Sequence, residues 1–323
     1  MTIISKGPVD GLLEFLNNHA IHIRDPSDLS SKIDRIKAAG LDKFQVISDF
    51  DKTLTPQWLR DPCSKTGALR PCHASHGVIE ASHLVSDQFR TLTAELARKY
   101  IPIEHDHRLS VEERTNAVIE WYTAAHDAMM NEHLSSTSLE DIVNTCWSRF
   151  DIHLRSRGPE FFKALQDASI PVTVLSAGLR DVIECILVSE KILPAVANSD
   201  DDESDSLVMV VSNRMRFDAR GDHVGFSHPI IHAFNKRDAL HEFLVKSPAR
   251  ANRPNALLMG DLIADVDFVH SIPNLEEYIA IGFLADGGSP DRLDDYLKHF
   301  DVVVMGGSAG MHVPIEVIKA LTT

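Results

Sequence analysis

The sequence has little cysteine, and its cysteines are widely spaced along the 323 residues. They are Cys63, Cys72, Cys146 and Cys185. Cysteines without tight pairing do not predict a disulfide framework, and this usage is typical of a reducing compartment. Cys63 and Cys72 fall near His73 and His76, which raises the alternative of a zinc site. Neither the C-x₂-C nor the H-x₃-H spacing of such sites is present.

Long apolar runs are also missing. No stretch approaches the ~20 apolar residues of a helix that spans a membrane, and residues 1–18 lack the charged-then-apolar pattern of a secretory signal. We therefore predict a cytoplasmic protein without membrane association. The 44 % hydrophobic content is that of an ordinary globular protein, and the length suffices for a core domain and a second lobe.

Basic residues are outnumbered, with 32 Lys and Arg against 47 Asp and Glu and a formal net charge of −15. This balance argues against binding to nucleic acid polymers, because their affinity depends on neutralising many phosphates. A mononucleotide differs, since one lysine and one metal ion can hold it. An acidic run at residues 200–205 is interpreted as a solvated loop.

Two aspartates stand where an apolar strand runs into a threonine-bearing loop. Side chains alternate between faces in extended chain, so Asp49 and Asp51 point the same way and Phe50 points into the core. Such a pair persists if a cation neutralises it or if one member is protonated. The pattern favours a phosphoryl-transfer site, and the alternative is a solvated pair at a strand end.

Three further segments carry polar residues in similar contexts. The apolar strand 172–175 leads to Ser176 and Gly178, and 179–187 is predicted to be a helix, which places Ser176 at a helix N-terminus where anions are favoured. The alternative is that Ser176 is a bare helix cap. Lys236 precedes another helical pattern. A strand ending in Gly260 leads to Asp261 and Asp265, whose oxygens suit a hard cation.

Strand and helix signals alternate as in a parallel α/β sheet, with ligands expected at the carboxyl ends of the strands. A β-hairpin is predicted between residues 213 and 226. Between 56 and 157 the pattern changes to helix, with a capping box at Ser110 to Glu113. The predicted strands are 44–48, 172–175, 207–211, 256–259, 278–284 and 302–305, and the predicted helices in the insert are 78–100, 111–133 and 139–150.

The segment 49–53 resembles the Asp-x-Asp-x-Thr motif of the haloacid dehalogenase superfamily. Within it, the chain is similar to the cytosolic 5′-nucleotidase III family, which comprises pyrimidine 5′-nucleotidases and 7-methylguanosine phosphate-specific enzymes. The resemblance runs from about His22 to the C-terminus, and the segments that carry it are 120–123, 176–178, 211–213 and 231–236. It implies a Rossmann-like parallel sheet core at 1–55 and 158–323, with a helical cap at 56–157 that sets specificity.

The resemblance also implies a role for each site residue. Asp49 is the nucleophile, Asp51 the general acid and base, and Ser176 and Lys236 position the phosphoryl oxygens. Asp49, Asp51, Asp261 and Asp265 are assigned as the ligands of Mg²⁺. Substrate contacts are assigned to Glu104, Trp121, Tyr122, Ser176, Ala177 and Lys236, the first three being expected at the base. An aromatic pair can stack a base and a carboxylate can accept from an amino group, but the alternative is that Trp121 and Tyr122 are cap core and Glu104 is solvated.

The implied function is Mg²⁺-dependent hydrolysis of UMP and CMP through an aspartyl-phosphate, extending to 7-methyl-GMP and to phosphate transfer to nucleosides. The expected partner is a nucleoside 5′-monophosphate, and the protein is expected to be a monomer. The alternatives are a phosphatase for another small phosphomonoester and a nucleotide-binding protein without turnover. Three departures from the family pattern put substrate choice in doubt: Ala125, Arg180 and Leu262.

Overall fold

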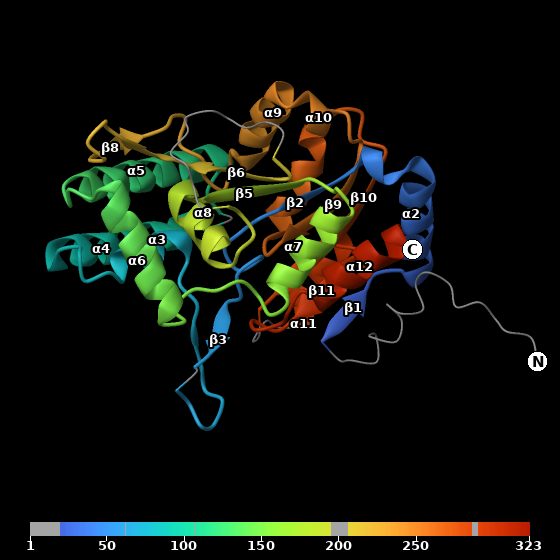
Figure 1. The fold of residues 1–323 in the computed structure, drawn as a ribbon, viewed down its shortest axis with the longest axis horizontal. Coiled ribbons are helices and arrows are strands. Elements are labelled where there is room, and N and C mark those ends of the chain that lie inside the picture. The colour runs from blue at the N-terminus through green and yellow to red at the C-terminus, as the bar shows by residue number, and fades with distance from the viewer. Residues whose placement is uncertain (1–19, 62, 107, 195–205, 286–289) are drawn as a thin grey trace, which may run out of the picture.

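A seven-stranded sheet forms the centre of the computed structural model, which describes residues 20–61, 63–106, 108–194, 206–285 and 290–323 (Figure 1). The strands are β1 (Ile21–Ile23), β2 (Phe44–Ser48), β5 (Val172–Leu179), β6 (Val208–Asn213), β9 (Asn255–Gly260), β10 (Glu277–Leu284) and β11 (Val302–Met305). Their order is β1-β11-β10-β9-β2-β5-β6, and all are parallel except β1. The six predicted strands are therefore confirmed, and β1 was not predicted.

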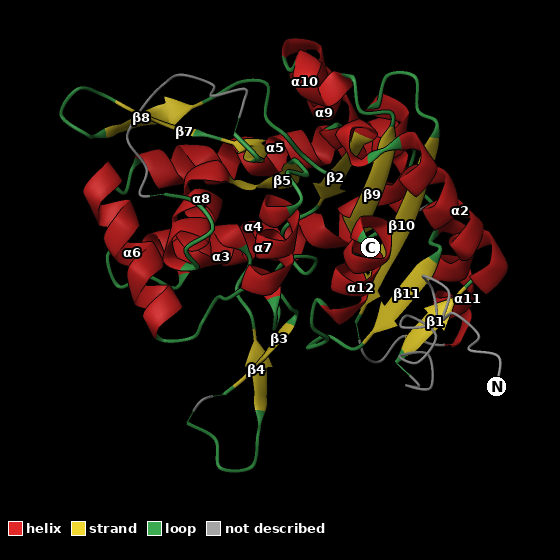
Figure 2. Cartoon of the chain, turned by 45° about the vertical axis from the view of Figure 1, so that its right-hand side comes forward, coloured by secondary structure: helices red, strands yellow, loops and turns green. Residues whose placement is uncertain are grey.

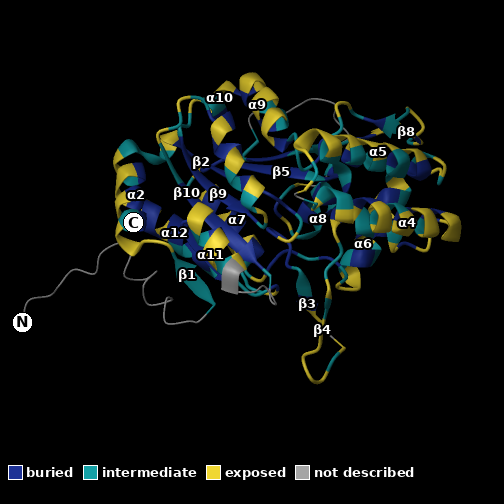
Figure 3. Cartoon of the chain, turned by 180° about the vertical axis from the view of Figure 1, so that it is seen from behind, coloured by how far each residue is buried: buried dark blue, intermediate teal, exposed yellow. Residues whose placement is uncertain are grey.

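Helices cover both faces of this sheet, because the side chains of each strand alternate between two hydrophobic clusters. Val46 and Leu257 belong to one cluster, whereas Ile47 and Leu258 belong to the other. Figure 3 shows the buried strands lying between helices that are exposed on their outer sides. The first cluster includes α2 (Pro26–Ala39), α7 (Gly158–Asp167), α8 (Arg180–Ser189) and α12 (His312–Thr322). The second includes α9 (Lys236–Lys246), the 3₁₀ helix η2 (Ile263–Ser271) and α11 (Pro290–His299).

A helical insert follows β2 and lies beside the sheet (Figures 1 and 2). It begins with the short hairpin β3 (Trp58–Arg60) and β4 (Leu69–Pro71) and continues with α3 (Ser75–Glu80), α4 (Asp87–Glu104), α5 (Val111–Met130) and α6 (Ser136–Ser148). The predicted helix 78–100 is wrong as one helix. The chain breaks at residues 81–86, where the Ser86 hydroxyl accepts from Phe89 N and caps α4. The capping box of Ser110 and Glu113 at α5 is confirmed.

The predicted hairpin near residue 220 is confirmed as β7 (Met215–Phe217) and β8 (His223–Phe226). It lies against the insert, because His223 N donates to Leu134 O and Ser136 N donates to Gly221 O, both at 2.9 Å. The bounds of the core and cap domains stay a prediction. The acidic run 200–205 lies outside the described residues. In the described part of the chain, no helix has the length and apolarity needed to cross a membrane.

Candidate active site

The strand order places three predicted site residues at one edge of the sheet. Strand β2 lies between β9 and β5 in the sheet. The chain adds β5 and β6 on one side of β2 and later adds β9 and β10 on the other side, so the strand order reverses at β2. Such a switch point opens a crevice at the carboxyl ends of the strands. Asp49 follows β2, Asp261 follows β9, and Ser176 lies in β5. A 3.0 Å hydrogen bond from Asp49 N to Met259 O fixes Asp49 beside β9.

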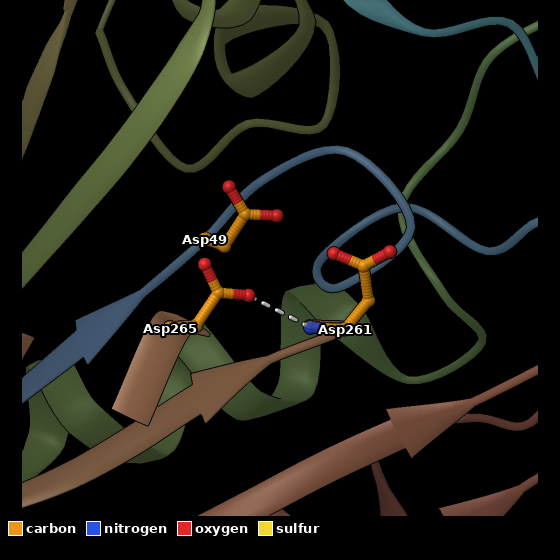
Figure 4. Close-up of side chains that lie close together, drawn as sticks. All are labelled: Asp49, Asp261 and Asp265. Carbon is orange, nitrogen blue, oxygen red and sulfur yellow. Dashed lines mark hydrogen bonds between the residues drawn. The ribbon is translucent and has the colours of Figure 1, made fainter. Parts of the chain in front are cut away.

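Three carboxylates meet in this crevice (Figure 4). One carboxylate oxygen from each of Asp49, Asp261 and Asp265 lies within 4.8 Å of the other two. Among the described residues, this is the one group of three or more Asp, Glu, His or Cys side chains close enough together to hold a metal ion. Asp265 also holds the loop, since its Oδ2 accepts from Asp261 N at 3.1 Å and Leu262 N at 3.0 Å. This approach requires glycine at position 260, because a Cβ there would lie 2.4 Å from the Asp265 Cβ.

Lys236, the first residue of α9, supplies a cation to this cluster. Its Nζ donates to Asp49 Oδ1 at 2.6 Å and lies 3.6 Å from Asp265 Oδ1. Burial by itself would lower the pKa of Lys236, but the carboxylates of Asp49 and Asp265 raise it above its ordinary value. The ammonium therefore stays charged, and one such charge faces three carboxylates.

The remaining negative charge is costly in this buried crevice. Burial raises the pKa of Asp261 well above its usual range, and the charges of Asp49 and Asp265 raise it further. Burial likewise raises the pKa of Asp265. Carboxylate oxygens converging in this way suit a hard divalent cation, which would relieve the repulsion. The donor set therefore fits the Mg²⁺ expected from the sequence.

Asp51 is hydrogen-bonded to a serine of the insert. Ser75 N donates to Asp51 Oδ1 and the Ser75 hydroxyl donates to Oδ2, each at 2.9 Å. Burial raises the pKa of Asp51 to about 6, and the charge of Asp49 contributes. A Cβ at Gly178 would lie 1.9 Å from Ser75 Oγ, so glycine is required there too. The sequence interpretation missed Ser75, whose one signal is its place at the start of a helix.

The prediction that Ser176 lies at a helix N-terminus is wrong. Strand β5 continues to Leu179, and α8 begins four residues beyond Ser176 at Arg180. The strand is irregular here, since its register against β6 shifts between Leu175 and Leu179. The buried Ser176 hydroxyl accepts from Gly178 N at 3.0 Å, which curls residues 176–178 into a small loop at the strand end.

Asn213 joins this loop to the segment before Lys236. Its Nδ2 donates to Ala177 O and Ile231 O, and its Oδ1 accepts from Ile231 N, each at 2.8 Å. Asn213 is buried, so these bonds satisfy its amide within the protein. The loop that carries Ser176 and the loop that leads to Lys236 are therefore fixed relative to each other.

Two of the three predicted base-binding residues interact electrostatically with the residues at the carboxyl ends of the strands. Glu104 ends α4, and burial raises its pKa while the neighbouring basic side chains, those of His105, Lys52 and Lys236, lower it. Burial also raises the pKa of Tyr122 on α5, and the charge of Glu104 adds to that shift. Trp121 differs, because it stacks on Tyr100 with ring centroids 6.2 Å apart. The charge of Glu104 therefore acts on Tyr122, whereas Trp121 of α5 packs against Tyr100 of α4.

The three departures from the family pattern have distinct surroundings. Arg180 Nε donates to Glu184 Oε1 at 2.7 Å within α8. Leu262 is 39 % exposed beside Asp261, and Ala125 is half-buried on α5. As for the zinc alternative, Cys63 is exposed in the β3–β4 loop, whereas the ring of His76 packs edge-on against Tyr122.

Comparisons with known proteins identify the family of this chain. The model of the family described as pyrimidine 5′-nucleotidase (UMPH-1) matches residues 64–322. The chain is 30 % identical over 289 residues to the 7-methylguanosine phosphate-specific 5′-nucleotidase of Gallus gallus, covering 90 % of this chain and 92 % of the relative. It is 31 % identical over 301 residues to the protein of that name from Drosophila melanogaster, covering 93 % and 86 %.

A solved structure shares the whole architecture. The crystal structure of cytosolic 5′-nucleotidase IIIB bound to cytidine superposes with a TM-score of 0.79 at 28 % identity, covering 97 % of each chain. The family model spans most of the chain, and the site carries the acidic cluster and lysine that the resemblance implied. The protein therefore belongs to the cytosolic 5′-nucleotidase III (UMPH-1) family of the haloacid dehalogenase superfamily, and it is a phosphoric monoester hydrolase, a 5′-nucleotidase.

Proposed function

We propose that this 5′-nucleotidase hydrolyses pyrimidine nucleoside 5′-monophosphates, with CMP and UMP as its main substrates and 7-methyl-GMP as a further one. The family model is named for pyrimidine nucleotides and the solved relative holds cytidine, whereas the curated relatives are named for 7-methylguanosine phosphate. The observation that carries the chemistry is the convergence of Asp49, Asp261, Asp265 and Lys236 at one crevice. The name of the solved relative also supports action in the cytosol.

Asp49 attacks the phosphorus and forms an aspartyl-phosphate, with the bond to the ribose oxygen breaking. Asp51 donates its proton to that leaving oxygen and later takes a proton from the water that hydrolyses the acyl phosphate. Its raised pKa suits this exchange because the protonated form is present near neutral pH. Lys236 and Ser176 hold the phosphoryl oxygens, because this chemistry depends mainly on positioning and charge stabilisation.

A divalent cation, which we propose to be Mg²⁺, would be held by Asp49, Asp261 and the Asp51 backbone carbonyl, with Asp265 supporting the site. When bound, it supplies positive charge to the phosphoryl group. Asp265 has a second task, since it holds the backbone of Asp261 and Leu262. Phosphate transfer from Asp49 to a nucleoside follows from the same intermediate.

For the base, Glu104 and Tyr122 are proposed to be the contacts. An ionised carboxylate accepts from an exocyclic amino group, which CMP and 7-methyl-GMP carry and UMP lacks. We therefore expect CMP to be cleaved with a higher kcat/KM than UMP. Trp121 lines this side of the insert and is proposed to support Tyr122, which its ring meets edge-on at a centroid distance of 5.7 Å.

The test is a substrate screen with the purified protein, with Mg²⁺ and with a chelator. CMP, UMP, 7-methyl-GMP, phosphoserine and p-nitrophenyl phosphate are compared by phosphate release. Asp49→Asn is expected to lose roughly 10⁴-fold or more in kcat. Equal rates for substrates with and without a base would contradict the roles of Glu104 and Tyr122. Phosphate release by Asp49→Asn at the parent rate would contradict the mechanism.

A further inference from the structure

A cavity borders the carboxylate cluster on the side of Asp261. It has a volume of about 470 Å³, within the ~300–1,000 Å³ range of small-molecule sites. Its lining includes Asp261 but not Asp49, Ser176 or Lys236. It is therefore a space next to the proposed phosphoryl position rather than that position itself.

The lining of this cavity is basic in a chain that is strongly acidic overall. Lys52, His105, Arg155 and Arg292 line it, and Asp261 is the one carboxylate among the lining residues. The guanidinium of Arg155 donates to three backbone carbonyls, those of Lys52, Thr53 and Ala309, so its contacts do not neutralise its charge. Across the described ranges, neither Lys52 nor Arg292 forms an ion pair with a carboxylate. The cavity is consequently suited to an anion.

The backbone presents Lys52 at this cavity in a strained conformation. Lys52 has a backbone φ of 64°, a value that residues other than glycine rarely adopt. Its N–H donates to Thr55 Oγ1 at 3.0 Å, and its carbonyl accepts from Arg155. A strained residue that its neighbours hold in place beside a reactive centre is typical of a functional position.

Arg292 lies on another element that lines the cavity, α11. Its guanidinium carbon lies 5.9 Å from the centre of the Tyr296 ring, and the Tyr296 hydroxyl donates to the Asp261 backbone carbonyl. Lys52 and Arg292 therefore come from different elements, and each element contacts the loops at the carboxyl ends of the strands. Guanidinium and ammonium groups are the usual protein ligands of phosphate.

We propose that this cavity is a second anion site, in which Lys52 and Arg292 bind the phosphate of a phosphate-bearing ligand next to the catalytic centre. The ligand is either inorganic phosphate leaving the enzyme or the phosphate of a second nucleotide. In both cases the chemistry that recognises it is that of a phosphate dianion. This proposal goes beyond the proposed function, because it concerns a ligand that is not the one being cleaved.

Isothermal titration calorimetry can count this site separately from the catalytic one. With Mg²⁺ and beryllium fluoride, a mimic of the phosphorylated aspartate, Asp49 is blocked, and complete loss of phosphate release verifies the block. Inorganic phosphate is then titrated into the blocked protein. We expect one phosphate to bind, and Arg292→Gln and Lys52→Met each to raise its Kd about tenfold or more. Arg98→Gln, a change of an exposed arginine on α4, is the matched control and should bind phosphate as the parent does.

A parallel titration with CMP separates the two sources. Binding of phosphate without binding of CMP identifies product on its way out, whereas CMP that competes with phosphate identifies a second nucleotide. Absence of phosphate binding to the blocked protein would overturn the proposal, as would unchanged binding in both cavity variants. Failure of beryllium fluoride to block the enzyme would instead count against the nucleophilic role of Asp49. In that case, the unblocked protein is titrated with phosphate to saturation. The parent should then bind two phosphates and Arg292→Gln should bind one, which still tests the cavity.

Discussion

Asp51 illustrates how a single residue at this site depends on a neighbour that is 24 positions away. Its carboxyl group is buried next to Asp49, an environment that favours the protonated form, and both of its oxygens accept hydrogen bonds from Ser75. Those bonds favour the charged form and fix the orientation of the group. The group that we propose to give and take one proton is therefore subject to two opposing influences on its pKa.

Ser75→Ala is expected to lower kcat about 10- to 100-fold, because it removes a hydrogen bond to a charged group. KM should change little, since the serine contacts Asp51 and not the phosphoryl position. Steady-state kinetics with CMP measure both values, and a melting curve monitors folding. Ser75→Thr keeps the hydroxyl and should recover part of the loss. A loss confined to KM would show that Ser75 does not position Asp51.

Site residues that lie at the ends of strands could be predicted from the sequence. Site residues that are brought in by packing between distant segments were missed. Asp49, Asp261 and Lys236 each adjoin a strongly patterned element, so their convergence could be anticipated. Ser75 and Tyr296 act through contacts between segments far apart in the chain, and nothing in their local sequence marks those contacts. Ser176 was predicted near the site but in the wrong backbone setting, because the strand continues through a small-residue segment that resembles a strand-to-helix turn.

At the scale of elements, the apolar strands of four or more residues in the central sheet were predicted well, whereas three of the four three-residue strands were not, the exception being β7, which was predicted as part of its hairpin. β1, β3 and β4 have three residues each, too few to show an alternating pattern. The break between α3 and α4 was missed for a different reason. Apolar spacing continues across residues 81–86, and Ser86 is also hydrogen-bonded to Glu132, which lies 46 positions away in the connection between α5 and α6.

Helix α8 and strand β7 are joined by the half-buried carboxylate of Asp181, whose charge is costly. Asp181 accepts from Met215 N at 2.7 Å, and burial raises its pKa from 3.8 to about 6. The folded protein thus binds this proton more tightly than the unfolded chain. Stabilisation from the protonated form is fully present below about pH 4 and is lost as the pH rises through about 6.

Asp181→Asn should keep the acceptor for Met215 N and remove this pH dependence. Compared with the parent, the variant is expected to be equally stable near pH 4 and more stable at pH 7.5, by on the order of 1 kcal/mol. Urea denaturation at both pH values measures the difference. Asp141→Asn, at an exposed position on α6, is the control and should follow the parent. An equal change at both pH values would contradict the burial of charge at Asp181.

At the scale of the whole molecule, the carboxylate cluster predicts that a divalent cation stabilises the fold. Mg²⁺ at 100 times its Kd should add about 2.7 kcal/mol to the free energy of unfolding. Thermal melts with Mg²⁺ and with a chelator measure this increase. Asp261→Asn should abolish it, whereas Asp267→Asn, at an exposed position on η2, should keep it. An unchanged melting temperature of the parent on addition of Mg²⁺ would contradict the proposed metal site.

The amino ends of the strands hold a second buried charge cluster, far from the carboxyl ends that carry the active site. Asp301 accepts from Lys32 Nζ at 2.9 and 3.0 Å and from Ala280 N at 2.9 Å, and it also pairs with Arg24. Helix α2 and strand β11 are tied together by these contacts. Removing one partner leaves charge that is buried and only partly compensated.

Lys32→Met should therefore lower the free energy of unfolding by about 3 kcal/mol and leave kcat/KM for CMP unchanged at a temperature where the protein is folded. Denaturation and kinetics on the same preparation check both parts. Lys43→Met, at an exposed site, should change neither value. A drop in kcat/KM without loss of stability would show that the two ends of the sheet are coupled.

The hairpin β7–β8 belongs to the second half of the chain, yet its backbone is hydrogen-bonded to the junction of α5 and α6. Transplanting residues 56–157 onto another scaffold would remove these bonds and uncover Phe226, whose ring stacks on His126 at 3.8 Å. A chimaera intended to exchange substrate preference between relatives must therefore carry two non-contiguous pieces, the inserted helices and residues 213–226.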